Sequence, residues 1–242
     1  MKRVTVTEIA LVFIGLGIGW LLIGQALQER LTLADIWTDL STNAGTEAIG
    51  IAITVLVIDR LYERRDQERE KQRIIRQMAS PSNDFALEAV RLARGNGWLT
   101  DGSIHKADLH EADLSNADLR GANLCEVNLR GANLCDANLC EVNLDGAELW
   151  VANLSRANLS RAKLSRAKLS GAKLSGADLG AANLWAAHLI MADLRGAALN
   201  GANLYEADLR GAKYDDNTQW PDGFDPVAAG AILVTESNET QP

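Results

Sequence analysis

The sequence predicts a mainly β solenoid preceded by α-helices, and three observations carry that prediction. A leucine returns every fifth residue, without a miss, from Leu109 to Leu209. An alanine or a valine stands two residues before each of these leucines. Aromatic residues make up only 5% of the chain, so the core has to be built from small regular units, which favours a repeat architecture.

The five-residue period determines the kind of repeat. In an α-helix, a step of five residues turns the side chain by about 140°, which would spread the leucines around the axis. In a straight strand, an odd period would place successive leucines on opposite faces. The chain therefore has to turn once per repeat. A short extended piece carries the alanine and the leucine on one face, and a corner follows, so that both side chains point into a solenoid.

The repeats are nearly invariant. From Ala107 they read ADLHE ADLSN ADLRG ANLCE VNLRG, and they end with AKYDD. Of 22 small positions, 20 are Ala and the others are Val127 and Val142; the central residue is Leu 21 times and then Tyr214. This pattern resembles the pentapeptide-repeat family, whose motif is A(D/N)LXX. The resemblance implies a right-handed quadrilateral β-helix, in which four repeats form one square coil with the small residue and the leucine inside.

Charged residues test the four-repeat coil, because residues twenty apart would then stack. Opposite charges occur at that spacing seven times between Lys106 and Asp215, and like charges never do. A spacing of fifteen gives four opposite and five like pairs, and a spacing of twenty-five gives five and one. The seven pairs are Lys106 with Glu126, Asp136 with Arg156, Glu141 with Arg161, Glu148 with Lys168, Lys173 with Asp193, Asp193 with Lys213, and Arg195 with Asp215.

Two apolar segments predict an α-helical transmembrane hairpin over residues 1–62. The first span, at about 9–27, has 19 uncharged residues, about the length that a helix needs to cross a bilayer; a cleaved signal peptide is the competing interpretation. The second span, at about 41–60, contains Glu47, which suits a helix start at the interface or a polar contact between helices. Basic residues flank the outer ends of both spans, so we expect both termini and the repeats to be cytoplasmic, at a bacterial-type inner membrane.

The rest of the chain divides into a charged helical stalk and linker at 63–83, a short N-terminal capping helix at 84–101, the repeat β-helix at 102–214, and a C-terminal cap with a disordered tail at 215–242. The capping helix has one apolar side, which would cover the open first coil. Trp220 and Phe224 can lie over the last coil, while Pro221 and Pro226 stop strand pairing.

The sequence predicts no enzyme. It has no phosphate-binding loop, no nucleophile with a base and no paired carboxylates, and the interior is filled by Ala and Leu, so we expect no catalytic residues and no cofactor. Cys125, Cys135 and Cys140 follow central leucines and point outward on three different faces. A metal site needs side chains that converge on one point, so we expect no metal and interpret these cysteines as free thiols.

Two sets of outward-facing residues are candidates for binding. The possible interaction surface consists of Trp150, Val151, Ile190 and Met191 on one face of the predicted square, with Trp185 and Tyr205 on an adjacent face. The possible basic belt surrounds one coil and consists of Arg156, Arg161, Lys163, Arg166, Lys168 and Lys173. The belt suits an acidic partner or nucleic acid. Acids stack over four of its members, so we interpret it as a structural ladder.

The first functional hypothesis is a membrane-tethered, non-catalytic protein–protein interaction or scaffold module. Its protein partners are unknown, and the hairpin contacts the lipid bilayer. The sequence does not decide whether the protein forms a homo-oligomer. The alternatives are an accessory subunit of a membrane complex and, from the family resemblance, a DNA-mimicking protein that interacts with topoisomerases. Residues 102–214 carry 12 basic and 13 acidic groups, whereas residues 215–242 carry none and 6. A duplex mimic needs dense negative charge, so the rod does not suit that role, and we expect no nucleic-acid binding.

Overall fold

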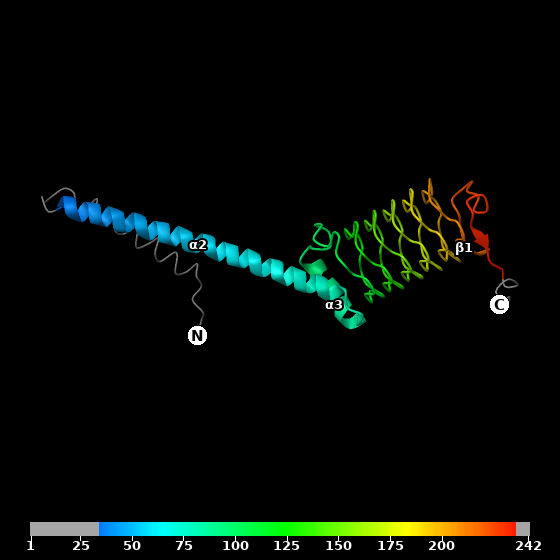
Figure 1. Cartoon of the computed structure of the whole chain (residues 1–242), viewed down its shortest axis with the longest axis horizontal. Coiled ribbons are helices and arrows are strands. Elements are labelled where there is room, and N and C mark those ends of the chain that lie inside the picture. The colour runs from blue at the N-terminus through cyan, green and yellow to red at the C-terminus, as the bar shows by residue number, and fades with distance from the viewer. Residues whose placement is uncertain (1–33, 236–242) are drawn as a thin grey trace. The chain divides into compact units, whose positions relative to one another are not determined.

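The computed structural model describes residues 34–235 of the chain (Figure 1). The described part contains helix α2 (Ala34–Met78), helix α3 (Asn83–Gly95) and two short strands, β1 (Lys213–Tyr214) and β2 (Ile232–Leu233), which pair in parallel. Between α3 and β1 the backbone winds through turns and single β-bridges, seen as stacked coils from green to orange in Figure 1. The described residues belong to two units that divide between Glu70 and Lys71.

Helix α2 runs without a break through the predicted second span at 41–60 and through most of the predicted stalk at 63–83. Within the described residues, no helix combines the length and the apolar character that crossing a bilayer requires. The structure therefore does not support a spanning helix at 41–60. The physical reason is that polar residues up to Glu47 and charged residues from Asp59 leave only a short apolar run between them. The first predicted span, at about 9–27, lies outside the described residues.

The repeats form the predicted four-sided coil. Parallel bridges join the Asp or Asn position of each repeat to the residue twenty positions later, beginning with Asp108 and Asn128 and continuing to Asp193 and Lys213. Each coil therefore contains four repeats, and residues twenty apart lie above one another on the same side. This confirms the square β-helix that the leucine period and the charge pairs indicate.

Each corner of the square is a tight turn. The Ala112 N–H donates to the Leu109 carbonyl at 3.2 Å, which closes a β-turn over His110 and Glu111. Glu111 has φ 55°, and a positive φ at the second central residue defines a type II turn. Fourteen described residues other than glycine have a positive φ, and all of them occupy this second turn position. The turn thus imposes the same strained backbone at every corner, where glycine, Asn and Asp are the favoured residues.

The motif satisfies the backbone hydrogen bonds of the coils that have a neighbour on both sides. The Leu114 N–H donates to the Asn133 carbonyl at 2.7 Å, and the Asn133 N–H donates back to the Ala112 carbonyl at 2.9 Å. The N–H of the first turn position has no backbone partner of this kind. It donates instead to the Asp or Asn of its own repeat, as Ser115 N does to Asp113 Oδ1 at 3.1 Å. The acidic or amide residue of the motif is therefore a backbone cap repeated in most repeats.

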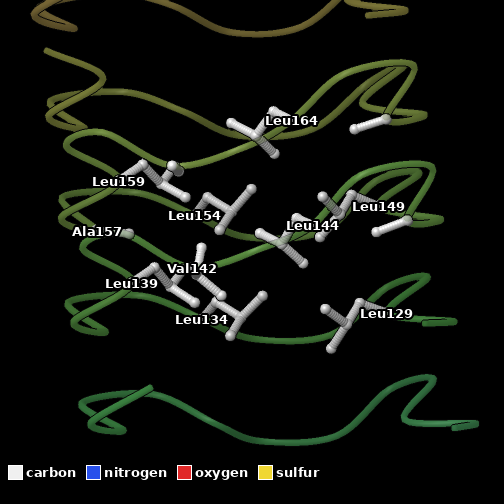
Figure 2. Packing of buried hydrophobic residues seen from close by; sticks show 14 of the residues in the cluster. Leu129, Leu134, Leu139, Val142, Leu144, Leu149, Leu154, Ala157, Leu159 and Leu164 are labelled. Carbon is white, nitrogen blue, oxygen red and sulfur yellow. The ribbon is translucent and has the colours of Figure 1, made fainter. Parts of the chain in front are cut away.

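The core is a column of alanines and leucines. From Leu109 to Leu199 every small and every leucine position is 0–1% exposed. Figure 2 shows the leucines of several coils side by side in the interior, with Val142 filling a position that is otherwise alanine. Each buried leucine contributes about 1.5–3 kcal/mol relative to an exposed one. The interior therefore carries the stability, and the outer positions are free for other roles.

Two side chains close the N-terminal end of the β-helix. The buried side of α3, with Ala86 and Ala93, packs on the first coil together with Ile74 and Met78 at the end of α2. Asn83 Nδ2 donates to the carbonyls of Asp113 and Ser115 at 3.2 and 2.9 Å. Arg94 Nη2 donates to the carbonyls of Asp118 and Arg120 at 2.8 and 3.2 Å. In later coils, the N–H groups of the preceding coil bind the equivalent carbonyls, so Asn83 and Arg94 stand in for a missing coil.

An aromatic cluster covers the C-terminal end. The Trp220 ring lies edge-on to Tyr214 at 5.5 Å between centroids and stacks on Phe224 at 5.2 Å. The segment with Pro221 does not pair as a strand, but the chain returns to the ladder in β2, where the Ile232 N–H donates to the Ala212 carbonyl at 2.7 Å. Residues 236–242 of the predicted disordered tail lie outside the described residues.

Candidate interaction surface

The six residues of the predicted interaction surface lie on two adjacent sides of the square. Trp150, Val151, Ile190 and Met191 belong to one side and its corner, and Trp185 and Tyr205 to the side before it in chain order. Val151, Met191 and Tyr205 are 59%, 71% and 68% exposed, while the other three are half-buried. The coil thus gathers apolar and aromatic side chains that are up to 55 positions apart in the chain.

Glycines frame the apolar corner of this surface. The corner carries, in successive coils, Gly131, Val151, Gly171, Met191 and Gly211. A Cβ on Gly171 would lie 3.2 Å from Val151 Cγ1, and one on Gly211 would lie 3.4 Å from Met191 Cγ. The side chains of Val151 and Met191 therefore pack against the glycines at the same corner of the next coil. Val151 also has φ 51°, a strained conformation for a β-branched residue, which marks this corner as unusual.

The basic belt and the aromatic surface are in contact. Lys168 Nζ lies 4.8 Å from the centroid of the Trp150 ring and 2.8 Å from Glu148 Oε1. The Arg166 guanidinium lies 5.2 Å from the Trp185 ring. Cation–π contacts of this kind fix the orientation of a half-exposed indole. The sequence does not indicate these contacts, because the residues that form them are 18 and 19 positions apart and not the twenty positions of a full coil.

Half of the basic belt is neutralised by the coil before it. Arg156 donates to Asp136 through two bonds of 2.8 and 2.6 Å, and Arg161 reaches Glu141 at 3.3 Å. With Lys168, these make three paired cations. In the part of the chain that the structure describes, Lys163, Arg166 and Lys173 form no ion pair. The belt is therefore partly a structural ladder, as the charge pattern indicates, and it retains three uncompensated cations.

Four of the seven predicted charge pairs are ion pairs, because Lys106 also reaches Glu126, at 3.3 Å. The other three predicted pairs do not form, because Asp193, Arg195 and Asp215 bind other groups. Arg195 binds Asp193 in its own repeat at 2.8 Å, and Asp215 accepts the N–H of Gly196 instead. The same fork within one repeat occurs at Asp118 with Arg120 and at Asp208 with Arg210. All three of these pairs lie in the tripeptide Asp-Leu-Arg, so this tripeptide is the sequence signal that predicts an ion pair within one repeat.

The hydrogen bonds of Arg156 hold the pKa of Asp136 well below its ordinary range, at about 2. Asp136 is therefore charged at any physiological pH, so its ion pair with Arg156 does not depend on pH in that range. Burial, with neighbouring acids, raises the pKa of the Cys125 and Cys135 thiols, which disfavours the reactive thiolate. The three cysteines are free and half-buried, and no group of metal-ligating side chains occurs among the described residues.

The ladder, the corners and the core define a β-helical repeat protein, and the comparisons assign its family. Residues 103–140, 143–180 and 177–213 match the model of the family "Pentapeptide repeats", with eight copies. The chain therefore belongs to the pentapeptide-repeat family, for which the β-helix is right-handed. No curated protein gives a significant match.

Three solved structures are similar to the repeat region. HetL, a pentapeptide repeat protein involved in heterocyst differentiation regulation from the cyanobacterium Nostoc sp. strain PCC 7120, is 40% identical over 45% of this chain and 58% of its own, with a TM-score of 0.35. The protein alr5209 from Nostoc PCC 7120 is 43% identical over 44% and 84%, with a TM-score of 0.26. QnrB1, a plasmid-mediated fluoroquinolone resistance protein, is 19% identical over 54% and 59%, with a TM-score of 0.33. The chain thus spans less than two thirds of the HetL structure.

Proposed function

We propose that this protein is a non-catalytic interaction module, and that its partner binds across the two adjacent sides that carry Trp150 and Trp185. The observation that carries the proposal is the joined surface of exposed apolar residues and cation–π pairs. Aromatic residues, Met and Arg are the types that concentrate in protein interfaces, and half-buried rings held in place lose little entropy on binding. The interior is filled by Ala and Leu, so function falls to the outer sides and the ends of the β-helix.

The chemistry of the surface favours a protein partner with an apolar contact and an acidic rim. Arg166 lies beside Trp185 and has no ion pair in the described part of the chain, and Lys163 precedes it on the same side. Charges at the rim of an apolar patch steer association and select the partner more than they add affinity. A DNA mimic is not favoured, because this surface is cationic where a mimic needs dense negative charge.

Cross-linking of the full-length protein in native membranes, followed by quantitative identification of its neighbours, tests this proposal. The double variant Trp150→Ser with Trp185→Ser should lose at least one neighbour that the wild type retains. Val227→Ser, at another exposed apolar residue, is the matched control and should keep the full set. An unchanged set of neighbours in the double variant would refute the proposal that a partner binds the sides with Trp150 and Trp185. A set composed of one membrane complex would identify an accessory subunit.

We further propose that the N-terminal 62 residues tether this module to the inner membrane, with the repeats cytoplasmic. The support is the uncharged run at about 9–27 and the basic residues that flank the two predicted spans. The apolar run from Ala48 to Ile58 in α2 would lie at the same membrane. The full-length protein should stay with membranes after carbonate extraction, and a variant without residues 1–33 should be released. Release of the full-length protein would contradict tethering.

A further inference from the structure

The last coil leaves its ladder fully open on the side of residues 202–206 and partly open on the side that follows. On the two preceding sides in chain order, the Leu194 N–H donates to the Lys213 carbonyl at 2.7 Å and the Leu199 N–H to the Gln219 carbonyl at 2.6 Å. On the side that follows, the Gly211 N–H donates to the Gly230 carbonyl at 2.8 Å, whereas the Leu209 N–H has no partner among the described residues. On the side formed by residues 202–206, the N–H groups of Leu204 and Glu206 have no partner within residues 34–235. The Ala202 carbonyl likewise accepts no bond there. Two donors and one acceptor therefore point along the rod axis without a strand to receive them.

The open side results from the path of the cap. The stretch of sequence that would form the next strand makes a turn instead, in which the Phe224 N–H donates to the Pro221 carbonyl at 3.0 Å. Proline lacks an N–H and fixes its φ, so this segment cannot extend the ladder. The core shows the effect, because Ala202 and Leu204 are 7% exposed, whereas Ala197 and Leu199 in the same coil are fully buried.

A groove of about 440 Å³ lies between this edge and the cap turn. Its walls are Ala202, Leu204, Tyr205 and Glu206 on the coil, and the segment from Pro221 to Phe224 on the cap. Glu206 and Asp222 are its charged lining residues, and no basic side chain lines it. The groove thus offers the edge of Leu204, which is 7% exposed, an exposed tyrosine and two acids beside unpaired backbone groups.

We propose that this groove binds an extended basic peptide segment of a partner protein, which adds a strand to residues 202–206. All bridges of the solenoid are parallel, so the peptide runs parallel to the edge. Its backbone supplies two carbonyls to the N–H groups of Leu204 and Glu206 and one N–H to the Ala202 carbonyl, and a leucine side chain packs on the exposed edge of Leu204. Strand addition of this kind takes affinity from the backbone and specificity from side-chain pockets.

Charge argues for a partner rather than for this chain. The segment 215–242 carries six acids and no base, and Glu236 and Glu239 lie in its last part. Placing that tail, or the cap of a second copy, against Glu206 and Asp222 would bring like charges together. A segment with Lys or Arg beside its leucine meets the two acids instead. This end site is separate from the sides that carry Trp150 and Trp185, so either proposal can fail without the other.

Residue-resolved hydrogen exchange of the full-length protein tests the inference. The probe is acetyl-Lys-Ala-Asn-Leu-Ser-Lys-amide at saturating concentration. Exchange at the Leu204 and Glu206 amides should be fast in the free protein and should slow about tenfold with the probe. The Leu199 amide serves as the internal control and should not change. A probe with N-methyl-Asn, which cannot donate to Ala202, and a probe with Asp in place of Leu should both fail to protect.

Matched variants separate the charge contribution from folding. Glu206→Gln with Asp222→Asn should weaken probe binding about tenfold, whereas Glu126→Gln, at the same turn position in another coil, should leave it unchanged. Equal protection by the Asp probe would overturn the inference. So would protection without a probe, whether it rises with protein concentration, as a second copy would cause, or vanishes on deletion of residues 236–242, as the chain's own tail would cause.

Discussion

Val151 packs over Gly171, with Cγ1 only 3.2 Å from the place that a Cβ on Gly171 would occupy. Gly171 itself has φ 69°. Each of the two residues therefore depends on the other, because the valine fills the space that the missing side chain leaves. Two separate costs, backbone strain and crowding, are expected when Gly171 gains a methyl group.

We expect Gly171→Ala to lower the free energy of unfolding by about 1–3 kcal/mol, since alanine at positive φ is strained and the new methyl crowds Val151. Urea denaturation of the wild type and the variant measures this difference in the free energy of unfolding. In a Val151→Gly background the crowding is absent, so the same change should cost less, and the difference gives the coupling of the pair. Equal costs in both backgrounds would show that only the backbone matters.

Asn138→Ala tests the cap within each repeat. Asn138 Oδ1 accepts the N–H of Cys140 at 3.3 Å, and alanine leaves this donor without its partner. We expect a loss of about 1 kcal/mol. Lys173→Ala is the control, because Lys173 stands at the same position and makes neither such a bond nor an ion pair in the described residues; it should change stability by less than about 0.5 kcal/mol. A loss as large for Lys173 would contradict the capping role.

The pair of Asp136 and Arg156 predicts an acid dependence. Arg156 lowers the pKa of Asp136 to about 2, below the value of about 3.9 in an unfolded chain. A depressed pKa in the folded state adds stability above about pH 4, and this addition is lost as the pH falls towards 2. Carboxyl ¹³C NMR should show Asp136 titrating near pH 2 in the wild type and near its ordinary value in Arg156→Gln. An unchanged titration in the variant would contradict the assigned cause.

Arg94 predicts a specific effect at the N-terminal cap. Its Nη2 donates to the carbonyls of Asp118 and Arg120, so Arg94→Leu leaves both acceptors without a protein donor. We expect a loss of about 2 kcal/mol, since these bonds involve a charged donor. Arg91→Leu, on the exposed side of the same helix, should have little effect on thermal unfolding. Similar losses from both variants would mean that the helix, and not the two bonds, decides the outcome.

The sequence was sufficient to predict the coil, because a strict period of five forces one turn per repeat and stacked charges select four repeats per coil. It could not predict the contacts of Lys168 with Trp150 or of Arg166 with Trp185, since these depend on the lateral reach of side chains between coils. The forks such as Asp193 with Arg195 compete with stacked pairs, and local geometry decides between them.

The ends of the solenoid were the least predictable part. The amphipathic pattern indicates that a helix covers the first coil, but not that Asn83 and Arg94 reach particular carbonyls. At the other end, Pro221 indicates that pairing stops, but only the path of the chain shows that the side of Leu204 stays open while β2 resumes the ladder. Sequence periodicity describes what repeats, and the two ends do not repeat.

Because the bridges join residues twenty positions apart, the position of a residue in the sequence determines the side of the square on which it lies. Removing one whole coil would bring the remaining residues together on the same sides as before. Removing a single repeat between Trp150 and Ile190 would instead rotate everything after it by a quarter turn. The core would be preserved, yet these two residues would no longer share a side. Evolution of such a rod can therefore rearrange binding surfaces by changing length alone.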